Sequence, residues 1–378
     1  MVKQKITALE YIRGISMLGV VGIHTGAYAL SNPKVNIHLF ALLEIFTRFS
    51  VPIFFFVSAF GLFLNQDLSS KLNYVTFMIR RARTVLLPYI VWSLFYMVHY
   101  TFISNDMSIW TRPLLYEYLL FGLASCQLYF LVILLWFYAL MPIWRSMVRR
   151  IIEHPLRNLS ILLLLQIIFN YYSSYLLKVD TSNIYLSKLL SFRLNYWVLH
   201  YLFIFLLGAV CAVKYAVFEQ LITRYQRYIK TFFYITLSGM LAFYYYLLYA
   251  SHYTPEQAVN TAHQLSPIGV LYTLAATLFS FMLFNQNKMP HIVRIILDSL
   301  GKHSYLVYLI HPLIMYYLTS YLLAHNIMMS APIVIGFYLL TTGMSLTFAI
   351  FIQKINNFFP IIGLLLIGSN LPKRKSGV

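Results

Sequence analysis

Arg13 and His24 lie in one apolar stretch of the sequence, YIRGISMLGVVGIH, with ten residues between them. An α-helix turns about 100° per residue, so this spacing places both side chains on one face, about 16 Å apart along the axis. Glu10 precedes Arg13 by three residues and can form an ion pair with it. Histidine is the side chain that most often serves as a general acid or base. The stretch therefore predicts a helix face with an ion pair at one end and a candidate catalytic residue, His24, farther along.

An arginine cluster, Arg80, Arg81 and Arg83, lies in the sequence FMIRRARTVLLPY. Arg80 and Arg83 are three residues apart and share one face of a helix. Guanidinium groups bind phosphate oxygens through pairs of parallel hydrogen bonds. The cluster is therefore suited to an anionic ligand, such as the phosphates of a nucleotide-linked donor.

A third set of polar residues, Ser304, Tyr308 and His311, lies in the sequence LGKHSYLVYLIHPLI. Their spacing of four and then three residues places them on one face of a helix. Pro312 follows His311 and loosens the helix backbone locally. A second histidine on a polar stripe favours a polar cavity between helices, lined by these three side chains.

Each of these features also has a purely structural explanation. In a membrane helix, Arg13 can extend towards the lipid headgroups with Glu10 as its partner. His24 can form a hydrogen bond to a neighbouring helix and have no catalytic role. The arginine cluster can simply anchor the end of a membrane span. The choice between these readings depends on the rest of the chain.

The composition indicates a membrane protein. Of the 378 residues, 60% are hydrophobic and only 10% are charged, whereas soluble domains have about 25% charged residues. The two cysteines, Cys126 and Cys211, fall in different predicted spans near opposite membrane faces. We therefore expect no disulfide between them, and since no zinc-ligand spacing is present we expect no metal site.

Ten runs of mostly apolar residues are long enough to cross a membrane, which takes about 20 residues per helix. They lie at roughly 8–29, 44–64, 84–104, 124–144, 158–177, 195–214, 230–250, 266–285, 304–323 and 330–353. The predicted fold is an all-α polytopic membrane protein with a single transmembrane domain over residues 1–357. Residues 358–378 are expected to form a short interfacial segment and a basic tail that contains Lys373, Arg374 and Lys375.

The distribution of lysine and arginine predicts the orientation of these spans. If the N-terminus is cytoplasmic, 21 of the 28 basic residues fall in cytoplasmic segments and six in outside segments, with Arg13 inside the first span. This bias is a strong positive-inside signal. An even number of spans then leaves both termini cytoplasmic, and we expect a multi-pass protein of the plasma or inner membrane. Most of the net charge of +18 reflects this topology, so we expect no nucleic acid as a partner.

Taken in order, these motifs resemble those of the acyltransferase-3 family of integral membrane acyltransferases, in its compact subgroup without a fused soluble domain. The matching parts are the Arg13–His24 spacing, FSVPIFFFVSAF at 49–60, the Arg80–Arg83 pair before LLPY, QLYFL at 127–131 and LGKHSYLVYLIHP at 300–312. They cover nearly the whole chain. The sequence departs from the family pattern at Ser58–Ala59, where Ser-Gly is usual, and at Tyr129, where tryptophan is common.

The resemblance implies ten spans and the transfer of an acyl group, often acetyl, from cytosolic acyl-CoA to a hydroxyl of a cell-envelope glycan or glycolipid. It makes His24 the catalytic candidate and Arg13, Arg80 and Arg83 functionally important. We expect Arg13, with Glu10, to orient the donor or to hold the electrostatics of the site. His24 would act either as a general base or as a transient carrier of the acyl group. The remaining candidates are Arg80, Arg81 and Arg83 for the phosphates of the donor, and Ser304, Tyr308 and His311 for the acceptor side.

A second function class remains open from the sequence. Ten spans with kinking prolines and buried polar residues also suit an exporter or flippase of an envelope polysaccharide. A sensor or scaffold without catalytic activity is a third possibility. The identity of the acceptor and the oligomeric state do not follow from the sequence.

Overall fold

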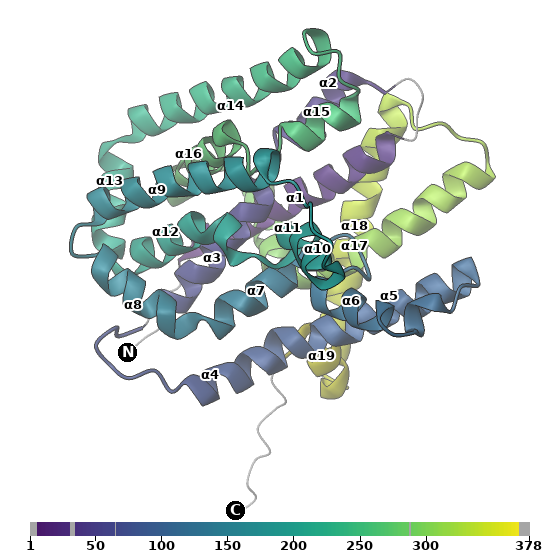
Figure 1. The fold of residues 1–378 in the computed structure, drawn as a ribbon, viewed down its shortest axis with the longest axis horizontal. Coiled ribbons are helices and arrows are strands. Elements are labelled where there is room, and N and C mark those ends of the chain that lie inside the picture. Colours follow the sequence, from purple (N-terminus) through teal and green to yellow (C-terminus); the bar gives the residue numbers. More distant parts are fainter. Residues whose placement is uncertain (1–5, 31–34, 65, 287–288, 370–378) are drawn as a thin grey trace, which may run out of the picture.

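The computed structural model describes residues 6–30, 35–64, 66–286 and 289–369, and within these ranges the chain is helical without strands. Lys373, Arg374 and Lys375 of the predicted basic tail lie outside the described residues. Figure 1 shows the helices packed into one bundle, with α1 (Thr7–Ala29, purple) near its middle. The central position of α1 matters because this helix carries Glu10, Arg13 and His24.

The described chain contains nineteen α-helices, several of them joined by short π-helical or 3₁₀ turns. After α1 they are α2 (Ile37–Phe40), α3 (Ser50–Phe63), α4 (Tyr74–Arg81), α5 (Leu87–Ser104), α6 (Leu114–Phe121), α7 (Tyr129–Ala139), α8 (Met141–Ile151), α9 (Pro155–Tyr171), α10 (Ile184–Ser191), α11 (Arg193–Tyr196), α12 (Leu202–Val213), α13 (Tyr215–Arg224), α14 (Gln226–Tyr249), α15 (Pro255–Thr261), α16 (Pro267–Asn285), α17 (His291–Ala324), α18 (Ala331–Asn356) and α19 (Pro360–Ile367).

Seven helical segments in the described ranges are long and apolar enough to cross a membrane, and nine if each of two sharply bent helix pairs counts as one span. This confirms an all-α polytopic membrane protein. α1 is not among them although its 23 residues are long enough, because Glu10, Arg13 and His24 make it less apolar than the others. Counting α1 as well would give the ten spans expected from the sequence. That number and the cytoplasmic location of both termini stay predictions.

One predicted span contains a sharp bend, and another ends at one. α7 and α8 meet at an angle of 70° within the predicted span 124–144. Pro142 lies in the first turn of α8, where its ring and missing N–H prevent α7 from continuing. The predicted span 195–214 comprises a 3₁₀ turn and α12, and α13 then leaves it at 102°.

Two other spans begin earlier than the sequence predicted. The side chain of Asn36 caps the helical segment Ile37–Phe63, and Asn73 caps the segment Tyr74–Ser104. Asparagine is a preferred N-cap because its side-chain oxygen accepts hydrogen bonds from the first free N–H groups of the helix. As a result, the arginines at 80–83 lie inside one continuous helical segment, around a π-helical turn at Ala82–Leu86, rather than ahead of a span.

The crossing between α1 and α17 is close and depends on two glycines. A Cβ at Gly14 would collide with the carbonyl oxygen of Leu297, and one at Gly301 with the carbonyl oxygen of Glu10. Small residues at such crossings let membrane helices approach backbone to backbone. The crossing therefore brings the start of α1, with its ion pair, against the first half of α17.

The C-terminal helix α19 packs against α5 and α18. The indole N–H of Trp92 in α5 donates a hydrogen bond to the carbonyl oxygen of Leu366, at 3.1 Å. Gly368 ends the helix with φ +65°, a conformation that favours glycine, and its backbone lies against that of Thr84. The segment predicted to be interfacial therefore folds back beside the arginine-bearing turn.

Candidate active site

A cavity of about 680 Å³ lies at the end of the bundle where α1 begins. It is lined by the start of α1, parts of α3 and α7, the first half of α17, the end of α18, and the end of α4 with the turn after it. Its polar lining residues are Glu10, Arg13, Ser58, Arg81, Thr84, Tyr138, Lys302, Ser304, Tyr305, Tyr308 and Gln353. The N-terminal end of α1 is the side that the charge distribution predicts to be cytoplasmic.

Three cationic side chains line this cavity, against one carboxylate among its described lining residues. Arg13 pairs with Glu10 at 3.1 Å, which confirms the ion pair expected from the sequence, and its side chain remains one-third exposed. The guanidinium of Arg81 lies 5.2 Å from the ring centres of Phe77 and Tyr138, and cation–π attraction holds it there. The excess of positive charge suits an anionic ligand.

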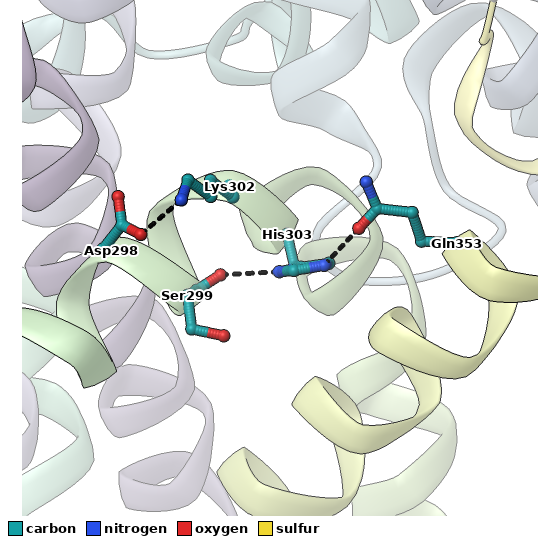
Figure 2. A network of polar contacts seen from close by, with 5 residues as sticks. All are labelled: Asp298, Ser299, Lys302, His303 and Gln353. Carbon is teal, nitrogen blue, oxygen red and sulfur yellow. Dashed lines mark hydrogen bonds and ion pairs between the residues drawn. The ribbon is translucent and has the colours of Figure 1, made fainter.

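The third cation, Lys302, belongs to the polar network shown in Figure 2. Lys302 forms an ion pair with Asp298 one turn earlier in α17. Nδ1 of His303 lies 2.8 Å from the carbonyl oxygen of Ser299, and the other ring nitrogen contacts the side-chain amide of Gln353. The network ties α17 to α18 at the cavity wall and leaves Lys302 half exposed beside it.

The three arginines of the predicted cluster have different surroundings. Arg81 lines the cavity, whereas Arg80 and Arg83 are exposed and are not among its described lining residues. The helical geometry explains the difference, because Arg81 points about 100° away from Arg80, while a spacing of three brings Arg83 back towards the face of Arg80. A phosphate-binding role for any of the three stays a prediction.

A second, smaller pocket of about 60 Å³ surrounds His24. Its other lining residues are Val20, Ile23, Arg48, Val51, Phe54, Gln127, Tyr129, Phe130, Gln264 and Tyr308. On α1 the pocket is lined by Val20, Ile23 and His24, whereas the larger cavity is lined by Glu10 and Arg13 near the start of the same helix. His24 therefore lies deeper in the bundle than Arg13, towards the opposite end, in the direction expected from the sequence.

One layer of aromatic rings separates the cavity from the pocket. Phe54, Phe130 and Tyr308 line both spaces, and we call these three side chains the aromatic partition. The ring of Phe130 lies 6.1 Å from that of Phe54 and 5.6 Å from that of Tyr308. The Tyr308 hydroxyl donates a hydrogen bond to the carbonyl oxygen of Gln127. Arg13 and His24 thus share a helix face but face two separate compartments.

The three polar residues predicted on one face of α17 lie at different positions between the large cavity and His24. Ser304 lines the large cavity, where its hydroxyl donates to the carbonyl oxygen of Gly301 at 2.9 Å. Tyr308 belongs to the partition, and the ring of His311 lies 5.1 Å from that of His24. The stripe therefore runs from the cavity to His24. A substrate-binding role for these residues stays a prediction.

His311 is fully buried, and its two ring nitrogens have different surroundings. Nδ1 lies 3.1 Å from the carbonyl oxygen of Val307. A carbonyl oxygen can only accept, so Nδ1 carries the proton of the neutral ring and Nε2 presents a lone pair. Within the described part of the chain, Nε2 has no hydrogen-bond partner. The structure therefore places an unused acceptor next to His24.

Two features of the site are absent from the sequence-based hypothesis. The first is Cys126, whose Sγ lies 3.6 Å from Nδ1 of His24. It immediately precedes the QLYFL block, but a separation of 102 residues gives no local signal that the two side chains meet. The second is a buried ion pair between Glu44 and Arg48, at 2.9 Å. The four-residue spacing of Glu44 and Arg48 in the sequence could have indicated this ion pair.

The Glu44–Arg48 pair lies beside His24. Arg48 lines the small pocket, and the side chain of Glu44 packs against Gly26 of α1, two residues after His24. Both side chains are nearly buried, with 12% of Arg48 and 4% of Glu44 exposed. Among the residues that the structure describes, no group of three or more His, Cys, Asp or Glu is arranged to hold a metal ion.

Comparison with known proteins gives one match. A family model described as an acyltransferase domain, that of the acyltransferase-3 family, matches residues 6–353, nearly the whole chain. No curated protein and no solved structure matches the chain. The match spans every residue of the cavity, the aromatic partition and the His24 pocket.

Proposed function

This chain belongs to the acyltransferase-3 family of membrane acyltransferases, and we propose that it transfers an acetyl group from cytosolic acetyl-CoA to a hydroxyl of a cell-envelope glycan or glycolipid. The family supports an acyltransferase over the exporter that the sequence left open. The observation that carries the proposal is the division of the site. A large cationic cavity is separated by one layer of rings from a small pocket that contains a histidine.

The large cavity is the proposed donor site. The nucleotide end of coenzyme A carries several phosphate charges, and Arg13, Arg81 and Lys302 supply positive charge in the same cavity. The thioester lies at the far end of a long, thin pantetheine arm. That arm would reach towards His24 by displacing the partition side chains, most simply by rotation of Tyr308 away from Gln127.

The small pocket is the proposed reaction site. A ring nitrogen of His24 accepts the proton of the attacking group, whose lone pair forms a bond to the thioester carbonyl carbon. The carbon–sulfur bond to coenzyme A breaks, and the departing sulfur takes the proton. The net reaction converts a thioester and an alcohol into an ester and a thiol. Arg48, held by Glu44, would supply positive charge beside the developing negative charge.

The volume of the small pocket supports acetyl as the transferred group. Its volume of about 60 Å³ is less than a tenth of the 680 Å³ of the donor cavity. A pocket this small favours a short acyl group such as acetyl over a longer chain. Val20 contributes to the wall one helical turn before His24.

Enlarging this pocket is expected to relax the choice of acyl chain. Val20→Ala should raise the kcat/KM ratio of butyryl-CoA to acetyl-CoA about 10-fold, because each misfit methylene in a pocket changes discrimination by about 1–3 kcal/mol. Val21→Ala is the matched control, since Val21 is equally buried on α1 but is not among the lining residues. Competition assays with the two donors measure the ratio. Equal ratios for the two variants would contradict the proposed acyl site.

We expect the three neighbouring arginines to contribute unequally to coenzyme A binding. Arg81→Gln should weaken coenzyme A binding about 10-fold, equivalent to about 1.4 kcal/mol, because it removes a charge from the cavity. Arg80→Gln and Arg83→Gln are the controls and should weaken binding less, since both side chains are exposed. Calorimetric titration of the purified protein with coenzyme A measures this. Equal losses in all three variants would place the phosphates outside the cavity.

The overall proposal is tested by donor dependence in vesicles. Purified protein in vesicles with labelled acetyl-CoA and an extract of envelope glycans should produce labelled glycan, with the donor supplied on one side. Mass spectrometry of envelope glycans from a strain that lacks the protein should show the loss of one acetyl mass, which identifies the acceptor. If neither the label nor the mass changes with any acyl-CoA donor, the proposed reaction is wrong.

A further inference from the structure

Cys126 occupies a turn that faces His24. α6 ends at Gly122, whose φ of +69° lets the chain reverse, and a Cβ there would collide with the backbone of Tyr129. The N–H of Leu128 donates to the carbonyl oxygen of Ser125 at 3.0 Å, which closes the turn around Cys126. In this geometry the thiol lies 3.6 Å from Nδ1 of His24. The turn thus presents the thiol to α1.

The two free cysteines of the protein differ in access. Cys211 is buried in α12, whereas Cys126 is exposed. Besides His24, the Sγ atom of Cys126 contacts the side-chain oxygen of Gln127, at 3.7 Å. Both of these neighbours line the small pocket. A substrate that reaches the pocket can therefore also reach the thiol.

A thiol beside a histidine can act as an activated nucleophile. A neighbouring base removes the thiol proton, and the resulting thiolate is a strong nucleophile towards carbonyl carbon. Attack on a thioester exchanges one thioester for another, so the acyl group remains activated for the next step. The Cys126–His24 contact has the atoms needed for this exchange.

A second observation indicates that the same place receives a hydrogen-bond donor. Nε2 of His311 is fully buried and has no partner in the described residues, and the ring lies 5.1 Å from that of His24. A buried acceptor without a partner costs free energy unless a ligand satisfies it. A second hydroxyl of the acceptor sugar, beside the one that reacts, would supply the missing donor.

We propose that Cys126 carries the acyl group between donor and acceptor, as an acyl-enzyme in the reaction proposed above. In the first step His24 accepts the thiol proton, the Cys126 sulfur bonds to the acyl carbon, and coenzyme A leaves with that proton as a free thiol. In the second step His24 accepts the proton of the acceptor hydroxyl, and its oxygen bonds to the acyl carbon. The Cys126–acyl bond breaks, and the proton returns to the cysteine sulfur.

The aromatic partition would allow the donor and the acceptor to bind one after the other, as this order of steps requires. The Tyr308 hydroxyl donates a hydrogen bond to the carbonyl oxygen of Gln127, the residue next to Cys126, so the closed partition leaves the thiol on the His24 side. The donor can deliver its acyl group and withdraw before the acceptor binds. The two substrates then never occupy the site together, and ping-pong kinetics are expected.

The test uses the purified full-length protein with isotopically labelled acetyl-CoA and no acceptor. Peptide mass spectrometry after acid quenching should show one acetyl group on Cys126, removable by neutral hydroxylamine as expected for a thioester. Cys126→Ser should retain a hydroxylamine-resistant ester and transfer more than 100-fold more slowly. Cys126→Ala should carry no label, and Cys211→Ala, the matched control, should behave as the wild type.

Two results would contradict the proposed acyl-cysteine intermediate. One is transfer at the wild-type rate by Cys126→Ala. The other is a wild type that acylates its acceptor while any trapped label lies on His24 or nowhere, which leaves the proposed function intact. A wild type that acylates neither itself nor any acceptor instead overturns the proposed function. Labelling of the wild type is independent of how the variants fold.

Discussion

Replacing His24 by alanine is expected to abolish acyl transfer, with a loss of at least 100-fold in kcat. A positioned general base contributes about 10²–10⁴-fold, and His24 is the base for every proton transfer in the proposed reaction. The side chain is only half-buried and is not among the buried residues of α1, so expression and membrane insertion should persist. Labelled acetate transferred per mole of inserted protein measures the effect.

The control for this experiment is His38→Ala. His38 is exposed at the start of the segment Ile37–Phe63, hydrogen-bonded to Tyr245, and is not among the residues of the cavity or the pocket. Its replacement should leave transfer within two-fold of the wild type, as is usual for an exposed position (about 0.5 kcal/mol). Undiminished transfer by His24→Ala would show that the pocket is not the reaction site.

Replacing Gly301 by leucine is expected to prevent the protein from folding correctly. Any Cβ at this position meets the carbonyl oxygen of Glu10, which is backbone and cannot rotate away, so α1 and α17 must separate. Overpacking costs about 1–3 kcal/mol even where side chains can move, and we expect at least the upper value here. The yield of monodisperse protein in detergent and its thermal midpoint measure the loss.

The matched control is Gly336→Leu in α18, because no atom lies within 4 Å of a Cβ built there. This variant should be obtained in wild-type yield. Comparable yields of the two variants would mean that α1 and α17 do not cross as closely as described. Since the crossing brings Arg13, Lys302 and Ser304 into one cavity, its loss would also remove coenzyme A binding.

The parts of the fold that depend on local pattern could be predicted from the sequence. The helices around 230–250, 266–285 and 330–353 appear close to their predicted bounds, because a long apolar run is a direct consequence of crossing a membrane. The Glu10–Arg13 pair followed from a spacing of three residues. The bend between α7 and α8 inside the span 124–144 was not predicted, since the apolar run continues past Leu140 to Trp144.

The parts of the site that depend on long-range packing could not be predicted. The contact between Cys126 and His24 joins residues 102 positions apart, and no periodicity within either segment indicates it. The same is true of the aromatic partition, whose three side chains come from α3, α7 and α17. Which of the three arginines lines the cavity could not be predicted either, because arginines within one helical turn point in several directions.

The aromatic partition has a consequence for the membrane as well as for the reaction. A cavity open to one side and a pocket reaching towards the other would, if joined by water, let ions leak, and each charge crossing 100 mV dissipates about 2.3 kcal/mol. Apolar constrictions oppose this because water withdraws from them. In the proposed reaction, Phe54, Phe130 and Tyr308 would block ion flow, and passing only the thin, neutral pantetheine arm would let the enzyme move acyl groups without becoming an ion channel.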